Sequence, residues 1–244
     1  NKIKLNVKIF AVIIVFTLIL CVVFSVVGIV RGLTDSAPDI NEENIMPDGY
    51  PSIIYDANGK KVQKLMGINA NREYKKITDI PECVQNAFVA IEDARFYKHS
   101  GVDLQGILRA VFSALSDEKM TQGASTITQQ LLKNQVFGGG NEKSFFGKVS
   151  RKIQEQSLAI KLESTIDKKK ILEYYLNTIN LGQNTMGVET ASKRYFGKSV
   201  SKLTVSEAAV LAGITQNPTE YNPITEQQNN EAKRKIISVS YTHL

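Results

Sequence analysis

The feature that most constrains this chain is a long uncharged apolar stretch near its N-terminus. Residues 9–30 have the sequence IFAVIIVFTLILCVVFSVVGIV. At ~1.5 Å rise per residue, a helix of this length crosses the ~30 Å hydrocarbon layer of a bilayer. We therefore expect a transmembrane anchor. The alternative, a cleaved signal peptide, would have a shorter apolar region and an A-x-A-like cleavage site, which does not follow this stretch.

The basic residues around the stretch predict its orientation. Lys2, Lys4 and Lys8 precede it, and Arg31 is the one basic residue close behind it. The positive-inside rule then predicts residues 1–8 in the cytoplasm and the rest of the chain outside. The three lysines also supply half of the net charge of +6. Little positive charge is left for the remaining chain, so we expect no nucleic-acid partner.

Composition restricts the chemistry further. With 43% hydrophobic and 22% charged residues, the chain is typical of a globular protein. It has two cysteines, Cys21 inside the apolar stretch and Cys83, and no Cys/His cluster. Neither a disulfide framework nor a zinc site of the usual spacing fits this pattern. Any catalysis would therefore use carboxylates, amines and hydroxyls.

Beyond the anchor, the sequence predicts a linker and then a hairpin. Residues 31–50 are polar, contain two prolines and lack periodicity, which is typical of a linker that holds a domain off the membrane. Asn58-Gly59 then stands between two strand-like runs, Ser52–Tyr55 and Lys61–Leu65. This arrangement predicts a short β-hairpin near residues 52–65.

From Pro81 onward the apolar spacing is helical almost throughout. Residues 84–94, 104–115 and 171–179 repeat apolar side chains at intervals of three and four, and the capping box Thr204-x-x-Glu207 begins another helix. The fold beyond the anchor is therefore predicted to be mainly α. The apolar run 104–115 fits an ordinary core helix or a segment that dips into a membrane equally well.

Three segments carry side chains suited to chemistry. Glu92 follows Phe88 and precedes Phe96 at intervals of four, so its carboxylate would border an apolar face, where desolvation raises a carboxyl pKa toward the range of a general base. The segment QGASTITQQLLKN (122–134) joins a helix start to a lysine, and RKIQE (151–155) puts two cations and a carboxylate on one face. Taken singly, each also fits a plain alternative, namely a surface acid, a capped amphipathic helix and a solvated salt bridge.

Five segments in order resemble the motifs of the family 51 glycosyltransferases, the peptidoglycan glycosyltransferase domains of class A penicillin-binding proteins and of their monofunctional relatives. The resemblance covers roughly residues 50–225. It implies a lysozyme-like α-helical fold and processive polymerisation of lipid II, with inversion at the anomeric carbon and release of undecaprenyl pyrophosphate. The segments are AIEDARFYKHSGVD (90–103), QGASTITQQLLKN (122–134), RKIQE (151–155), ILEYYLNTINLG (171–182) and LTVSEAAVLAGITQNP (203–218).

The resemblance also implies a role for individual residues. Glu92 would be the general base that takes the proton from the acceptor sugar's 4-hydroxyl, and Glu155 would assist on the donor side. Lys133, Arg151 and Lys152 would hold the diphosphate. A divalent cation, Mg or Mn, is compatible with such a site, although no D-x-D pair demands it. The remaining substrate-site residues are Asp93, His99, Ser125, Thr126 and Gln129, with Glu173 and Asn177 as supports.

The expected partners and boundaries follow from the same resemblance. The partners are lipid II, the growing glycan strand and the bilayer, with cell-wall synthesis or division proteins as further candidates. The protein would be a single-pass protein of the bacterial cell membrane whose catalytic domain, residues 51–237, lies on the extracytoplasmic face. Residues 238–244 match nothing in the family and suggest truncation, and no set of S-x-x-K, S-D-N-like and K-T-G transpeptidase motifs is present. A lysozyme-like glycan-cleaving enzyme and a non-catalytic membrane-anchored scaffold remain the alternatives.

Overall fold

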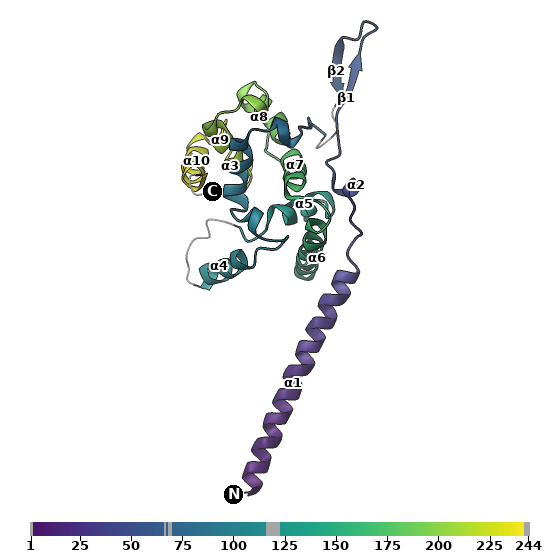
Figure 1. Cartoon of the computed structure of the whole chain (residues 1–244), viewed down its shortest axis with the longest axis vertical. Coiled ribbons are helices and arrows are strands. Elements are labelled where there is room, and N and C mark those ends of the chain that lie inside the picture. Colours follow the sequence, from purple (N-terminus) through teal and green to yellow (C-terminus); the bar gives the residue numbers. More distant parts are fainter. Residues whose placement is uncertain (1, 66, 68–69, 116–122, 242–244) are drawn as a thin grey trace.

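The computed structural model of the protein describes residues 2–65, 67, 70–115 and 123–241. A helical domain occupies the centre, one long helix leaves it on one side, and a two-stranded hairpin projects on the opposite side (Figure 1). The prediction of a mainly α fold with a short hairpin behind an N-terminal apolar helix is thus confirmed for the described part of the chain. Residues 242–244 of the predicted unmatched tail lie outside it.

The N-terminal helix α1 spans Lys2–Asp35 without interruption. Its segment Lys8–Asp35 is long and apolar enough to cross a membrane, and none of its most apolar window is buried. The helix continues past Val30 and ends against α6 (Phe145–Glu163), where the Gln154 side-chain amide donates a hydrogen bond of 3.0 Å to the carbonyl of Leu33. The apolar helix is therefore joined directly to the domain.

The segment between anchor and hairpin differs from the free linker that its polar sequence suggests. The first five of residues 31–50 extend α1, and a one-turn helix α2 (Glu42–Ile45) follows, closed by a capping box between Asn41 and Asn44. Ile45 is fully buried in the hydrophobic core, and the Tyr174 hydroxyl donates a hydrogen bond to Glu42. Buried Ile45, the Tyr174–Glu42 bond and a hydrogen bond of 2.8 Å from the Gln135 amide to the Met46 carbonyl hold this segment on the domain.

The hairpin forms where the Asn58-Gly59 signal predicts it. Strands β1 (Ser52–Tyr55) and β2 (Lys61–Leu65) pair antiparallel, with Ser52 opposite Leu65. Gly59 adopts a φ of +74°, which suits glycine in a tight turn. Nearly all residues of both strands are exposed, so the hairpin adds no apolar core of its own.

The buried apolar residues of the described helices form one hydrophobic core. Helix α3 packs against α9 and α10, and α5 packs against α6 and α7. The predicted Thr204–Glu207 capping box is present at the start of α9. The other helices are α3 (Glu82–Glu92), α4 (Leu104–Leu115), α5 (Ile127–Gln135), α7 (Lys168–Thr178), α8 (Val188–Phe196), α9 (Val205–Ile214) and α10 (Gln227–Tyr241), with 3-10 turns at Ile77–Asp79, Phe96–Lys98 and Val200–Lys202.

One glycine lets the loop after α3 approach α6. Gly101 has a φ of +90°, and a Cβ placed on it would lie 2.5 Å from the backbone carbonyl carbon of Ala159 in α6. Its own carbonyl accepts a hydrogen bond of 2.8 Å from the Thr126 hydroxyl. The absence of a side chain at Gly101 therefore allows the loop after α3 to contact both α6 and the residue before α5.

We expect Gly101→Ala to lower the free energy of unfolding by more than the roughly 1–2 kcal/mol that a left-handed backbone costs an L-residue. Gly197→Ala is the matched control, because Gly197 has a φ of +67° but open space around its Cβ position. Chemical denaturation in detergent measures both variants. Equal losses for the two would show that close contact with Ala159 contributes nothing.

Candidate active site

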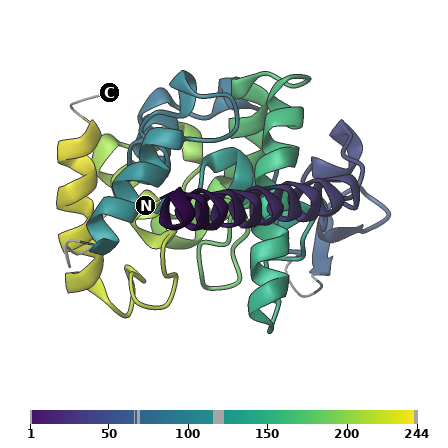
Figure 2. The same cartoon turned by 90° about the horizontal axis from the view of Figure 1, so that it is seen from below.

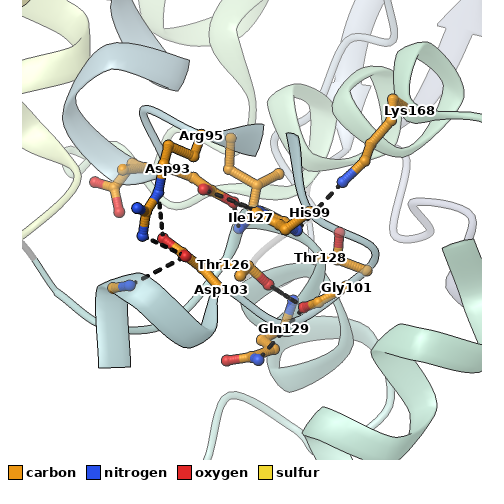
Figure 3. A network of polar contacts seen from close by, with 12 residues as sticks. Asp93, Arg95, His99, Gly101, Asp103, Thr126, Ile127, Thr128, Gln129 and Lys168 are labelled. Carbon is orange, nitrogen blue, oxygen red and sulfur yellow. Dashed lines mark hydrogen bonds and ion pairs between the residues drawn. The ribbon is translucent and has the colours of Figure 1, made fainter. Parts of the chain in front are cut away.

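A buried carboxylate joins the end of α3 to the start of α5 (Figure 3). Asp93 follows the last residue of α3, and its side chain is 2% exposed. Its Oδ2 accepts a hydrogen bond of 3.0 Å from the backbone N–H of Ile127 and lies 2.9 Å from Nε2 of His99. The negative charge thus lies at the N-terminus of α5, where the helix dipole favours it. Asp93 and His99 are therefore engaged mainly with each other and with the backbone.

The loop between α3 and α5 is held by further side-chain bonds. Arg95 forms an ion pair with Asp103, whose Oδ1 accepts the backbone N–H of Gly106 at 3.0 Å. The Thr126 hydroxyl caps α5 by accepting the N–H of Gln129 at 3.2 Å. The sequence assigned Thr126 and Gln129 to the substrate site. Both are buried, and they lie at the base of this loop.

Glu92, the last residue of α3, is half-buried and faces a small pocket. Its Oε2 accepts a hydrogen bond of 2.7 Å from the Gln130 side-chain amide, and its Oε1 accepts one from the Thr215 hydroxyl. The Tyr175 hydroxyl in turn lies 3.5 Å from Oε1 of Gln130, which turns the amide N–H₂ of Gln130 toward Glu92. Both carboxylate oxygens are thereby fixed in direction.

Sequence reasoning did not assign these two partners of Glu92. Gln130 and Thr215 both lie within segments that carry the family resemblance, so position within a motif was the available signal. Sequence reasoning also left Lys233 of α10 unassigned. This residue is 8% exposed, and its amine donates a hydrogen bond to the Gln216 side chain. Burial lowers the pKa of Lys233, and the negative charge of Glu92 opposes this shift. A cation therefore lies within electrostatic reach of Glu92.

The second cluster lies on α6, as the spacing of RKIQE predicts. Glu155 is fully buried and forms ion pairs with Arg151 and, at 2.8 Å, with Lys152. Arg151 also contacts Glu142 at 2.6 Å. Burial would lower the pKa of Arg151, but the hydrogen bonds that Arg151 donates to Glu142 and Glu155 outweigh burial and raise that pKa. A solvated salt bridge is excluded here, because the shared carboxylate has no access to water.

A lysine connects the two clusters. Nζ of Lys152 donates a hydrogen bond of 2.7 Å to the Ser125 hydroxyl. Ser125 lines the same pocket as Glu92 and Asp93, together with Gly123 and Ala124 of the segment before α5. The carboxylate of Glu92 in α3 therefore lines the pocket, and so does Ser125, whose hydroxyl contacts a cation of α6. Arg109 of α4 lines its rim.

The remaining predicted site residues lie farther from these contacts. Lys133 is in the last turn of α5, one turn beyond Gln130, and is half-buried. Glu173 accepts hydrogen bonds of 2.6 Å from the N–H of Ile77 and 2.7 Å from Lys170, and Asn177 donates to the Lys75 carbonyl at 2.8 Å. Glu173 and Asn177 thus fasten residues 72–77 onto α7 and support the site from outside it.

The described residues contain no group of three or more His, Cys, Asp or Glu side chains that could hold a metal ion. Both oxygens of Glu155 contact cations, and both oxygens of Glu92 accept hydrogen bonds. A bound Mg or Mn ion, which the sequence analysis found compatible with such a site, stays a prediction.

Glu92 thus borders a small pocket whose Ser125 hydroxyl contacts Lys152, a partly exposed cation that shares the buried Glu155 with Arg151. Comparison with known proteins identifies the family of the chain. The family model described as transglycosylase matches residues 58–241. The chain therefore belongs to the transglycosylase family, which confirms the family predicted from the five motifs and supports a peptidoglycan glycosyltransferase at family level.

Several curated relatives are similar to this chain. Penicillin-binding protein 1A of Clostridium acetobutylicum is 40% identical over 94% of this chain and 29% of its own length. Penicillin-binding protein 1A/1B of Bacillus subtilis is 39% identical over 91% of this chain and 24% of its own length. The chain thus spans less than a third of the length of these relatives. The match to a crystal structure of penicillin-binding protein 1A from Haemophilus influenzae covers 80% of this chain and 18% of the Haemophilus chain, at 23% identity. Its TM-score of 0.41 supports no argument about the fold.

The acid Glu173 should make stability depend on pH. Burial alone would raise its pKa, but hydrogen bonds from Lys170, Tyr74 and the N–H of Ile77 outweigh burial and lower it below the ordinary 4.5. A depressed folded-state pKa adds stability above about pH 4.5 that is lost as pH falls through the folded value. We therefore expect Glu173→Gln to be less stable than wild type at pH 7 and to lose less stability on acidification to about pH 3.

Denaturant unfolding between pH 7 and pH 3 measures this difference. Glu43→Gln is the control, because Glu43 is an exposed acid in the short helix α2. It should keep the pH dependence of the wild type. An unchanged pH dependence in Glu173→Gln would show that the contacts of Glu173 add no net stability.

Proposed function

We propose that this protein polymerises lipid II into β-1,4 glycan strands, with inversion at the anomeric carbon and release of undecaprenyl pyrophosphate. The observation that carries the proposal is the pocket that Glu92 shares with Ser125, whose hydroxyl contacts Lys152, one of the two α6 cations paired with the buried Glu155. The transglycosylase match over residues 58–241 and the class of the relatives support the same substrate. The growing lipid-linked strand would be the donor and lipid II the acceptor.

Glu92 acts as the general base in this proposal. Gln130 donates a hydrogen bond to one carboxylate oxygen of Glu92 and Thr215 donates one to the other. The remaining lone pairs of these oxygens can accept the proton of the acceptor's 4-hydroxyl. As that proton moves to Glu92, the hydroxyl oxygen attacks C1 of the donor and the bond from C1 to the diphosphate breaks. Attack opposite an α-linked diphosphate gives a β bond, so one displacement suffices and no enzyme nucleophile is needed.

The cations of α6 act on the leaving group. Negative charge collects on the departing diphosphate, and fixed positive groups in a partly desolvated site stabilise it. Arg151 and Lys152 supply this charge, with Lys133 as a further cation from α5. Glu155 orients both α6 cations, because its buried carboxylate contacts each of them. It is a positioning residue on the donor side.

The residues around the pocket keep Glu92 and the cations of α6 in place. Asp93 fixes the start of α5 together with His99. Thr126 and Gln129 donate to the Gly101 carbonyl, and the Ser125 hydroxyl accepts a hydrogen bond from Lys152. A fixed geometry of this kind lowers the cost of reaching the transition state. Glu173 and Asn177 act at a greater distance, by supporting α7.

We also propose the membrane arrangement predicted from the sequence. Residues 1–8 lie in the cytoplasm, 9–30 cross the bilayer, and the domain of residues 51–237 works outside, with residues 31–50 between them and 238–244 as an unmatched tail. The apolar side chains of α4 suit contact with the leaflet that holds the substrate, since Leu104 is 70% and Leu108 58% exposed. Cell-wall synthesis or division proteins remain predicted partners.

Glu92→Gln should reduce the rate of lipid II polymerisation at least ~10²-fold, because the amide cannot take the acceptor proton. Glu82→Gln is the matched control, an exposed acid at the opposite end of the same helix, and it should polymerise at the wild-type rate. Labelled lipid II in detergent micelles, resolved by gel, gives the rates. Wild-type polymerisation by Glu92→Gln would refute its role as the base, and release of fragments from finished glycan would favour a lysozyme-like hydrolase.

Lys152→Met should lower kcat/KM for lipid II by about 10- to 100-fold, since a hydrogen bond to a charged group contributes about 1.5–3 kcal/mol. Lys161→Met provides the comparison, because Lys161 is an exposed lysine near the far end of α6 that contacts Asp39. The same gel assay over a range of lipid II concentrations yields kcat/KM. Equal values for the two variants would remove Lys152 from the donor site.

A further inference from the structure

Helix α6 has an apolar face that turns away from the core. Phe146, Val149, Ile153 and Ile160 follow one another at intervals of three, four and seven, so they share one face of the helix. Phe146 is 66% and Ile160 54% exposed, and the neighbouring Phe145 is 82% exposed. The opposite face carries the buried residues Glu155, Leu158, Ala159 and Leu162. Helix α6 thus presents two apolar faces, of which the core covers one.

The position of α6 beside α1 indicates what the second face meets. The Gln154 amide contacts the Leu33 carbonyl at 3.0 Å and the Ser36 hydroxyl at 3.3 Å. Leu33 lies three residues beyond Val30, the end of the apolar stretch, which is about 4.5 Å along a helix. Helix α6 lies on the side of the domain from which α1 leaves (Figure 1), and the view from that side shows α1 crossing in front of the domain (Figure 2). Helix α6 therefore lies close to the end of the apolar stretch that we propose to cross the bilayer.

Charge near the apolar face agrees with a lipid surface. Lys143 and Lys148 flank Phe145 and Phe146, and both lysines are exposed. Interfacial helices bury their apolar face ~5–10 Å deep at the boundary between headgroups and acyl chains, while lysines reach the anionic headgroups. A protein partner would need no such basic border.

We propose that the outer face of α6, from Phe145 to Ile160, lies in the interface of the bilayer that α1 crosses. This contact is separate from that of α4, and its occupant is phospholipid. The same helix carries Arg151, Lys152 and Glu155, so the contact would fix the height of these cations near the phosphate groups of membrane lipids. This last consequence depends on the proposed function, whereas the lipid contact does not.

The absence of tryptophan from the chain allows a direct test. A single tryptophan is introduced by Phe146→Trp or Val149→Trp, with Val23→Trp in α1 and Tyr55→Trp in the hairpin as controls. Each protein is placed in bilayers whose acyl chains carry bromine near the headgroup. We expect the α6 reporters to lose about half or more of their emission, as a ring buried ~5–10 Å deep should, and to emit at shorter wavelength. Tyr55→Trp should be unaffected.

Two results would overturn the proposal. If both α6 reporters match Tyr55→Trp while Val23→Trp is quenched, the face of α6 lies in water. If they emit at short wavelength but bromine does not quench them, protein rather than lipid covers the face. Two separate reporter positions guard against one misfolded variant. Since fluorescence requires no turnover, the result is independent of the role of Glu92.

Discussion

One buried ion holds the active site together, namely the carboxylate of Asp93. It accepts the first backbone N–H of α5 and pairs with His99, so it joins the end of α3 to the start of α5. This junction brings Glu92, the neighbour of Asp93, to Gln130 one turn into α5. It also places Ser125, just before α5, within reach of Lys152 on α6. Removing this charge would weaken the junction of these segments, which the Thr126–Gly101 and Gln130–Glu92 hydrogen bonds also hold.

The site separates its charges according to the chemistry it has to perform. Glu92 is half-buried, and both of its described hydrogen bonds come from neutral donors. Glu155 is fully buried and paired with Arg151 and Lys152, which suits the fixed counter-ion that we propose rather than a base. The two acids thus lie in different surroundings, in line with the separate roles proposed for them. The apolar helix α1 ends against α6, so the proposed membrane crossing of α1 would fix the position of the α6 cations relative to the bilayer.

The sequence predicted those parts of the structure that local spacing controls. The Asn58-Gly59 turn, the helical periodicity after Pro81 and the contact of Glu155 with Arg151 four residues earlier need no tertiary information. The partners of Glu92 could not be predicted in this way, since Gln130 lies 38 and Thr215 lies 123 residues away. The burial of Ile45 was also missed, because the few apolar residues of the polar segment 31–50 show no periodicity. The family motifs predicted where the site lies, and the folded contacts added neighbours of Glu92 that the motifs alone did not assign.

The most direct test of the account is the configuration of the bond that the protein makes. The chain, in bilayers, is given lipid II labelled at the anomeric carbon, and the product is examined by nuclear magnetic resonance. The account predicts polymer in which every new bond is β-1,4, with one undecaprenyl pyrophosphate released per bond. An α-linked product, or a covalent sugar adduct on Glu92 or Glu155, would contradict it, because a single displacement assisted by a base yields neither.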